Sequence, residues 1–314
     1  MRTAAIVPTL NRVADLIACL DALDRQTLRP DRVLVVDNGS TDGTAEHVRE
    51  RNGVDPLWLR RPVGAPAAFA AGMREAFASG ADRVWLMDDD AVPADDALER
   101  LLERVAQPDA GQPVGGAAPM LHVGTGERYA GWRYGRNADG GRGQSANAPG
   151  PGGRPPHDEV DWAPFAGLLL CREACQAVGE VRGDFVLWHA DVDYCLRMRL
   201  AGYRLLAAPG AAVHHPPMAL TSRRVLGRTF SVGDYPAWRE YYDTRNRALL
   251  RRSLRGTEFD DATSLSRRAA RELARDAATL AADRAGPRRV LMRLLGLVDG
   301  LCGRTERRPE RGRI

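Results

Sequence analysis

Three consecutive aspartates, Asp88, Asp89 and Asp90, are the residues of this chain most directly suited to chemistry. They follow the apolar run 84–87 (Val-Trp-Leu-Met), which has the composition of a buried strand. Open α/β sheets bind their ligands at the carboxyl ends of such strands. Adjacent carboxylates repel one another, and a divalent cation with its phosphate ligand neutralises them. The pattern predicts a nucleotide–metal site, with an acidic first turn of the helix that starts near 94–99 as the alternative.

The spacing of apolar residues in the first half of the chain predicts the strands and helices that position this cluster. Short apolar runs alternate with segments whose apolar residues recur at helical spacing. The expected strands are 4–8, 32–36, 57–59 and 83–87, and the expected helices are 13–26, a helix ending near 51, and 65–79. This order predicts an α/β fold with a doubly wound, mostly parallel sheet and the acidic cluster after its fourth strand.

The composition changes between residues 135 and 156, where Gly, Pro, Asn and Arg replace almost all apolar residues. Such a segment buries too little apolar surface to offset the entropy of ordering. We therefore predict a mobile loop, which is either a lid or acceptor-side flap or a functionless insertion. Apolar sequence resumes at 160, and helical patterns dominate from about 237 to the end.

The chain has 314 residues and no lysine, so all 45 of its positive charges are arginines. A P-loop lysine, Schiff-base catalysis and a lysine general base are therefore excluded. The five cysteines form no Cys-x-x-Cys pair, and no zinc site or disulfide framework is expected. No apolar run is long enough to span a membrane, and the first residues do not have the pattern of a signal peptide. We expect a cytoplasmic protein.

The C-terminal segment 284–314 is basic, with nine arginines against three acidic residues. Within it, residues 288–298 combine an apolar stripe with flanking arginines. This pattern predicts either a helix that lies in an anionic membrane interface, on the inner face of the plasma membrane, or an ordinary packing helix. A basic end on a near-neutral body does not predict a nucleic-acid partner.

Three further motifs carry a family resemblance. The segments 6–12 (Ile-Val-Pro-Thr-Leu-Asn-Arg), 35–44 (Val-Val-Asp-Asn-Gly-Ser-Thr-Asp-Gly-Thr) and 87–90 together resemble the nucleotide-binding half of family 2 inverting glycosyltransferases of GT-A fold. The resemblance implies that the first two strand ends hold the base and ribose, and that the aspartate cluster holds the metal on the diphosphate. The implied donor-binding residues are Pro8, Thr9, Arg12, Asp37, Asp88 and Asp89. A turn-capping role is the alternative for Asp37.

Segment 188–197 (Trp-His-Ala-Asp-Val-Asp-Tyr-Cys-Leu-Arg) resembles the acceptor-side motif of galactofuranosyl- and rhamnosyltransferases. In that motif an acidic residue ahead of a helix is the general base. Asp191 matches this base by position, and Asp193 is the next candidate. The alternative for Asp191 is an N-cap of the helix through 199, a role that would not exclude catalysis.

Two later segments complete the resemblance. In 209–215 (Pro-Gly-Ala-Ala-Val-His-His), the register implies that His215 is a metal ligand beside Asp88 and Asp90, with His214 as the second choice and a surface histidine as the alternative. Segment 241–247 resembles a Tyr-x-x-x-Arg-Asn motif, in which Arg245 would clamp the leaving diphosphate.

The resemblance implies a GT-A catalytic domain over 1–218, with a donor half to about 130 and an acceptor half over 160–218, followed by a C-terminal helical extension over 219–314. It also implies Mn²⁺ or Mg²⁺ and a UDP-sugar or dTDP-sugar donor. The expected activity is inverting transfer of galactofuranose or rhamnose to a saccharide or lipid-linked acceptor in cell-envelope glycan synthesis.

Segment 62–69 departs from the family pattern, because it lacks an Asn-x-Gly and a glycine pair, and this leaves the donor sugar open. Two other functions also stay open. One is a sugar-nucleotide nucleotidyltransferase, although residues 9–12 lack the expected Gly-rich signature. The other is a non-catalytic membrane-docking module with the same fold.

Overall fold

The computed structural model describes residues 1–107, 111–124, 127–129, 132–134, 144–146, 158–217, 219–225, 228–260 and 286–309. Most of the loop predicted at 135–156 lies outside these residues. The described chain forms two compact units. The first contains residues 1–134, 144–183 and 190–216, and the second contains residues 184–189 and the chain from 217 onward.

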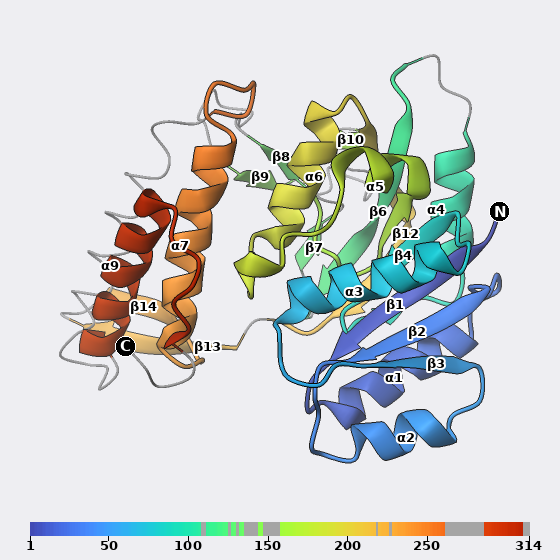
Figure 1. Cartoon of the computed structure of the whole chain (residues 1–314), viewed down its shortest axis with the longest axis horizontal. Coiled ribbons are helices and arrows are strands. Elements are labelled where there is room, and N and C mark those ends of the chain that lie inside the picture. The colour runs from blue at the N-terminus through green and yellow to red at the C-terminus, as the bar shows by residue number, and fades with distance from the viewer. Residues whose placement is uncertain are drawn as a thin grey trace. The chain divides into compact units, whose positions relative to one another are not determined.

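The N-terminal part of the first unit has the predicted alternation of strands and helices (Figure 1). Strands β1, β2, β3 and β4 pair in parallel in the order β4-β1-β2-β3. The elements are β1 (Thr3–Thr9), α1 (Val13–Asp24), β2 (Arg32–Asp37), α2 (Thr44–Glu50), β3 (Val54–Trp58), α3 (Ala65–Ala78) and β4 (Arg83–Leu86).

Helices cover both faces of this sheet. Leu16 and Leu20 of α1 pack with Ala5 and Val7 of β1 on one face. Helix α3 covers the other face, where Gly72 lies so close to the sheet that a Cβ there would stand 2.4 Å from Ile6 Cγ2. Glycine is therefore required for α3 to approach β1 this closely. The predicted doubly wound core is confirmed.

Most of the remaining strands of the first unit extend the same sheet, and two of them form a separate two-stranded sheet. The remaining elements of the unit are β5 (Val92–Pro93), α4 (Ala97–Ala106), β6 (Val114–Val123), β7 (Glu127–Tyr129), β8 (Trp132–Tyr134), β9 (Gln144–Ala146), β10 (Glu159–Val160), β11 (Leu168–Cys171), α5 (Arg172–Val178), α6 (Ala190–Leu200) and β12 (Arg204–His215). A 3₁₀ turn at Gly183–Phe185 begins at the last residue before the chain enters the second unit. Strand β11 runs antiparallel between β4 and β6, and β12 is parallel to β6. Strands β1, β2, β4, β6 and β12 therefore all end at the same edge of the sheet.

The second unit contains a hairpin of β13 (Leu220–Val225) and β14 (Arg228–Gly233), followed by α7 (Trp238–Ser253) and α9 (Gly286–Cys302). The hairpin was not among the predicted elements. Helices α7 and α9 lie side by side (Figure 1). Their backbones touch, because a Cβ on Gly296 would stand 2.3 Å from Tyr241 O and one on Gly300 2.6 Å from Arg245 O.

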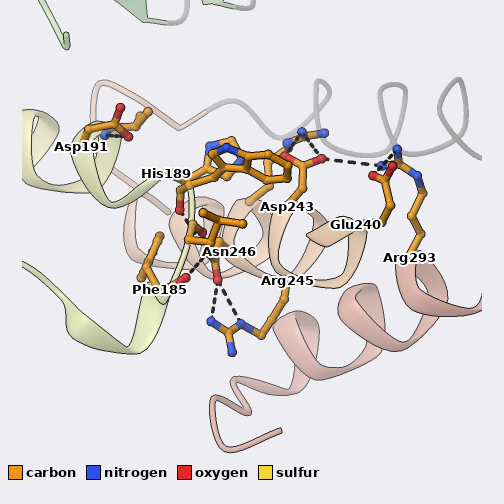
Figure 2. Close-up of polar contacts among 12 residues, drawn as sticks. Phe185, His189, Asp191, Glu240, Asp243, Arg245, Asn246 and Arg293 are labelled. Carbon is orange, nitrogen blue, oxygen red and sulfur yellow. Dashed lines mark hydrogen bonds and ion pairs between the residues drawn. The ribbon is translucent and has the colours of Figure 1, made fainter. Parts of the chain in front are cut away.

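The α7–α9 contact also buries charged side chains. Arg289 and Arg293, two arginines of segment 288–298, form ion pairs with Glu240 of α7 at N–O distances of 3.0 and 2.6 Å, and Figure 2 shows the pair with Arg293. The Glu240 side chain is 2% exposed. These two arginines are thus structural ion-pair partners, and the packing-helix interpretation holds for this face of α9.

Candidate nucleotide and metal site

The aspartate cluster lies in the turn that follows β4. The Met87 amide donates to Ile6 O of β1, and the Ala91 amide closes the turn on Asp88 O. The chain then forms β5, and α4 begins only at Ala97. The cluster is therefore separate from the first turn of α4, and the alternative of an acidic helix start is wrong.

His215 reaches the cluster through a strand pairing that joins distant parts of the chain. The end of β12 pairs with β5, so that Val213 lies opposite Pro93 and His214 opposite Val92. His215 Nε2 stands 3.2 Å from Asp90 Oδ1 and 3.6 Å from Asp88 Oδ2. The ligand atoms of these three residues all lie within 4.8 Å of one another.

The orientation of the two histidines separates the first choice from the second. His215 Nδ1 lies 2.7 Å from Pro216 O, a contact that directs Nε2 toward the carboxylates. His214 is exposed, and its ring packs on His122 of β6. The structure therefore brings His215, and not His214, to the two aspartates.

The carboxylates of the cluster favour a positive charge beside them, and the pKa shifts of three residues show this effect. Burial alone would lower the pKa of His215, but hydrogen bonds and charges from Asp88 and Asp90 outweigh it and raise that pKa to about 10. Burial raises the pKa of Asp89 to about 7, against the opposing effects of Arg12 and Thr9. The pKa of Asp90 is lowered, because His215 and Arg12 outweigh its burial. Two carboxylates and an imidazole at this spacing fit a divalent cation, which would take the place of the histidine proton.

The end of β1 is tied directly to the same cluster. The Thr9 hydroxyl donates to Asp89 Oδ2 at 2.8 Å. Arg12 lies 3.1 Å from Asp89 Oδ1 and 2.8 Å from Asp90 Oδ2, while Pro8 is buried within the strand. Arg12 and Thr9 therefore organise the aspartates, and their role in base binding stays a prediction.

Asp37 ends β2 and shapes the loop beside it. Its Oδ1 accepts the Ser40 amide at 3.0 Å, which is the turn-capping role given above as the alternative. Asn11, a non-glycine residue at φ 54°, accepts the Thr41 amide on its Oδ1 at 2.6 Å. The loops after β1 and β2 are thus joined, and base binding by Asp37 stays a prediction.

Asp191 is the second residue of α6, so it is not an N-cap. Its Oδ1 accepts the Val192 amide at 2.8 Å, and the side chain is partly exposed. Asp193 is 1% exposed and pairs with Arg197 Nε at 2.9 Å. Of the two, Asp191 is the carboxylate more accessible to an acceptor, and its role as base stays a prediction.

Arg245 does not lie where a residue that clamps the leaving diphosphate would be expected. It is fully buried, and its guanidinium donates to Asp184 O, Thr305 O and Asn246 Oδ1 within the second unit. It also stacks on Tyr242 at 4.8 Å. Because its donors are used inside the fold, we assign it a structural role and do not carry the clamp forward.

Comparison with known proteins gives the family context. Residues 4–138 match the model described as glycosyl transferase family 2. The chain is 45% identical over 92 residues to galactofuranosyltransferase GlfT1 of Mycobacterium tuberculosis, which covers 27% of this chain and 29% of that protein. It is 29% identical over 219 residues to succinoglycan biosynthesis protein ExoA of Rhizobium meliloti, covering 68% of this chain and 63% of that protein. The chain thus matches less than a third of the first relative's length.

Solved structures resemble the chain over most of its length. GalNAc-T7 with UDP, GalNAc and Mn²⁺ superposes with a TM-score of 0.61 at 15% identity, covering 87% of this chain and 51% of that one. Mannosyltransferase PcManGT of Pyrobaculum calidifontis with GDP-Man and Mn²⁺ gives 0.56 at 19% identity, covering 96% and 87%. At these identities the likeness establishes the fold, which is that of GT-A glycosyltransferases.

Proposed function

Residues 4–138 belong to glycosyl transferase family 2, and on this premise we propose that the chain is an inverting glycosyltransferase that uses a UDP-sugar or dTDP-sugar. The acceptor is a saccharide or lipid-linked hydroxyl in cell-envelope glycan synthesis. The observation that carries the proposal is the convergence of Asp88, Asp90 and His215 at the edge where the parallel strands end. We propose galactofuranose rather than rhamnose as the transferred sugar, because the chain is 45% identical over 92 residues to GlfT1, a galactofuranosyltransferase.

In this proposal Asp88, Asp90 and His215 hold Mn²⁺ or Mg²⁺. The bound ion supplies charge compensation for the leaving diphosphate. Thr9 and Arg12 keep Asp89 fixed beside the ligands. Asp37, at the end of β2, and Pro8, in β1, contribute to the base and ribose pocket.

The reaction itself needs one proton acceptor. Asp191 takes the proton of the acceptor hydroxyl as the hydroxyl oxygen attacks the anomeric carbon from the side opposite the diphosphate. The new C–O bond forms while the bond to the diphosphate breaks, and the nucleoside diphosphate leaves with the electron pair. One displacement of this kind inverts the configuration at that carbon.

The outer side of α9 is the proposed contact with an anionic membrane surface. Leu291, Leu294, Val298 and Leu301 are each between 45% and 58% exposed and recur at helical spacing. The exposed Arg288 and Arg304 flank them. Within the described residues, no helix is long and apolar enough to cross a membrane. An interfacial helix with basic flanks is the arrangement that binds anionic lipid headgroups.

The test is a transfer assay with the whole chain. UDP-galactofuranose or dTDP-rhamnose is incubated with a lipid-linked acceptor and Mn²⁺, and nucleoside diphosphate and glycosylated product are quantified together. We expect transfer that chelation abolishes and that Asp90→Asn reduces. Consumption of neither donor would overturn the proposal. Formation of a sugar nucleotide from a nucleoside triphosphate and a sugar phosphate would identify a nucleotidyltransferase instead.

A further inference from the structure

Gln26, the second residue after α1, is a buried polar residue that is only 4% exposed. Its Nε2 donates to Ala22 O at 3.1 Å and to Ala94 O at 2.7 Å, and its Oε1 accepts the Leu98 amide at 3.0 Å. A buried amide needs partners for both of its polar atoms, and these three hydrogen bonds supply them. Ala22 belongs to α1 itself, whereas Ala94 and Leu98 come 68 and 72 residues after Gln26. Gln26 therefore ties the end of α1 to residues 94–98.

The next residue adds two hydrogen bonds to the same part of the chain. The Thr27 amide donates to Asp95 O at 2.7 Å, and the Thr27 hydroxyl donates to Glu99 Oε2 at 2.7 Å. The contact of the Thr27 side chain is exposed, whereas those of Gln26 are buried or part-buried. A hydrogen bond shielded from water is the more costly one to lose, because water does not replace the missing partner. The side chain of Gln26 is therefore the stronger of these two attachments.

Residues 94–98 continue β5, the two-residue strand that joins the two halves of the proposed metal site. The Ala94 amide donates to Ala212 O of β12 at 2.9 Å, next to the two residues of β5 that pair with the end of the same strand. Asp90 lies two residues before β5, and His215 directly follows the part of β12 that pairs with β5. The position of β5 against β12 therefore sets how far His215 stands from Asp90.

Helix α1 also holds the chain on the other side of β5. Arg12, the N-cap residue of α1, pairs with Asp89 and Asp90 at 3.1 and 2.8 Å. Between its two ends, the buried side of α1 shares an apolar cluster with Ala91. The 12 residues of α1 extend over about 18 Å. Arg12 and Gln26 thus attach one helix to two points of the chain with β5 between them, and all of these residues belong to the first unit.

We propose that Gln26 is a positioning residue of the metal site. Through its hydrogen bonds to residues 94–98 it holds β5 in place, and β5 holds His215 beside Asp90. This role rests on the proposed function, in which Asp88, Asp90 and His215 bind a divalent cation. A strand of two residues has few hydrogen bonds of its own, so its position depends on the residues that follow it. Gln26 lies outside the ligand set and acts on metal affinity through the backbone.

The experiment compares Mn²⁺ binding by the wild-type chain and by Gln26→Met, which keeps the approximate volume of the side chain and removes its hydrogen bonds. Mn²⁺ is titrated in a calorimeter at saturating UDP, without donor sugar or acceptor. Removing a residue that orients metal ligands typically costs about 10- to 100-fold in affinity, and we expect a loss of this order. In transfer assays the Mn²⁺ concentration that gives half the maximal rate should rise by the same factor, while kcat at saturating Mn²⁺ stays close to that of the wild type. Unchanged Mn²⁺ affinity would overturn the positioning role.

A matched control separates positioning from a general loss of stability. Leu34 of β2 is 1% exposed and lies two residues before Val36, whose side chain faces Gly72 of α3. It therefore lies on the face of the sheet opposite to α1. Leu34→Ala should lower Tm and leave the Mn²⁺ affinity of the folded protein at the wild-type value. An equal loss of Mn²⁺ affinity in Leu34→Ala would show that the metal site responds to stability alone, which would also overturn the positioning role.

A measurement on the wild-type chain covers the case in which Gln26→Met does not fold. If the contacts of Gln26 strengthen metal binding, the metal must strengthen those contacts by the same factor. Saturating Mg²⁺ and UDP should therefore slow amide hydrogen exchange over 94–98 by about 10-fold or more, and by a larger factor than over 168–171 in β11. Equal slowing in the two segments would overturn the role of Gln26 alone. A wild-type chain that binds neither Mn²⁺ nor Mg²⁺ with UDP would overturn the proposed metal site and, with it, this role.

Discussion

Asp191→Asn separates a catalytic carboxylate from a structural one. A positioned general base contributes about 10² to 10⁴ in rate, which corresponds to about 3 to 5 kcal/mol of transition-state stabilisation. The structural cost should be much smaller. Asn keeps an oxygen that can accept the Val192 amide, and the substitution forfeits only the charge in the first turn of α6, worth about 0.3 to 1 kcal/mol. Turnover should therefore collapse in a protein that is nearly as stable as the wild type.

The assay is single-turnover transfer at saturating donor, with UDP affinity measured on the same preparation. Asp193→Asn is the matched control, because it makes the same isosteric change on the same helix but removes the ion pair with Arg197. It should lower the melting temperature and leave the turnover of folded molecules close to that of the wild type. Near-normal turnover of Asp191→Asn would refute the assignment of the base, and loss of UDP binding would show that the variant reports on the donor site instead.

The remaining predictions concern the metal site, the α7–α9 contact and the membrane face. His215→Ala should weaken Mn²⁺ binding by about 10²-fold or more in calorimetry with UDP present, and unchanged affinity would remove it from the ligand set. Glu240→Gln removes the carboxylate that faces both Arg289 and Arg293, while Arg293 keeps Asp243 at 3.6 Å, and should lower the free energy of unfolding by about 3 to 5 kcal/mol; an unchanged urea midpoint would contradict this. Folding lowers the pKa of Asp243, because the contacts with His189 and two arginines outweigh its burial. The stabilisation that the Asp243 carboxylate provides is therefore complete above its ordinary pKa of about 3.9 and is lost as pH falls below that value. In Asp243→Asn the free energy of unfolding should consequently decrease less steeply than in the wild type as the solution is acidified. Leu294→Asp should reduce flotation of the protein with anionic vesicles. If the wild-type protein floats equally with neutral and anionic vesicles, the outer side of α9 is not a contact with anionic membranes.

The parallel part of the sheet could be predicted from sequence because its strands are short apolar runs separated by helical periodicity. The same reasoning could not give the direction of β11. Its run Leu168–Leu170 is apolar on both faces in either orientation, and pairing with β4 on one side and β6 on the other decides that it is antiparallel. The two-residue strand β5 is too short to carry any periodicity, although its pairing with β12 brings His215 to the aspartates.

The site was predictable where a residue's role depends on its own strand end, and less so where it depends on a distant partner. Asp88 and Asp90 follow directly from the position of β4. The pairing of His189 with Asp243 joins two segments that were each recognised as motifs, but nothing in either motif indicates the other. Contacts between segments 54 residues apart are set by tertiary packing, which local patterns do not contain.

Arginine roles are the hardest to predict in this chain, because every positive charge is an arginine and residue type gives no distinction between binding and structural roles. A guanidinium has five donors on a rigid plane and stacks on aromatic rings, so it suits a phosphate and a set of backbone carbonyls equally well. Arg245 satisfies carbonyls and tyrosines in the interior, whereas Arg12, with 41% of its side chain exposed, pairs with the aspartates of the proposed metal site. Exposure and partners, which only the fold provides, decide between the two uses.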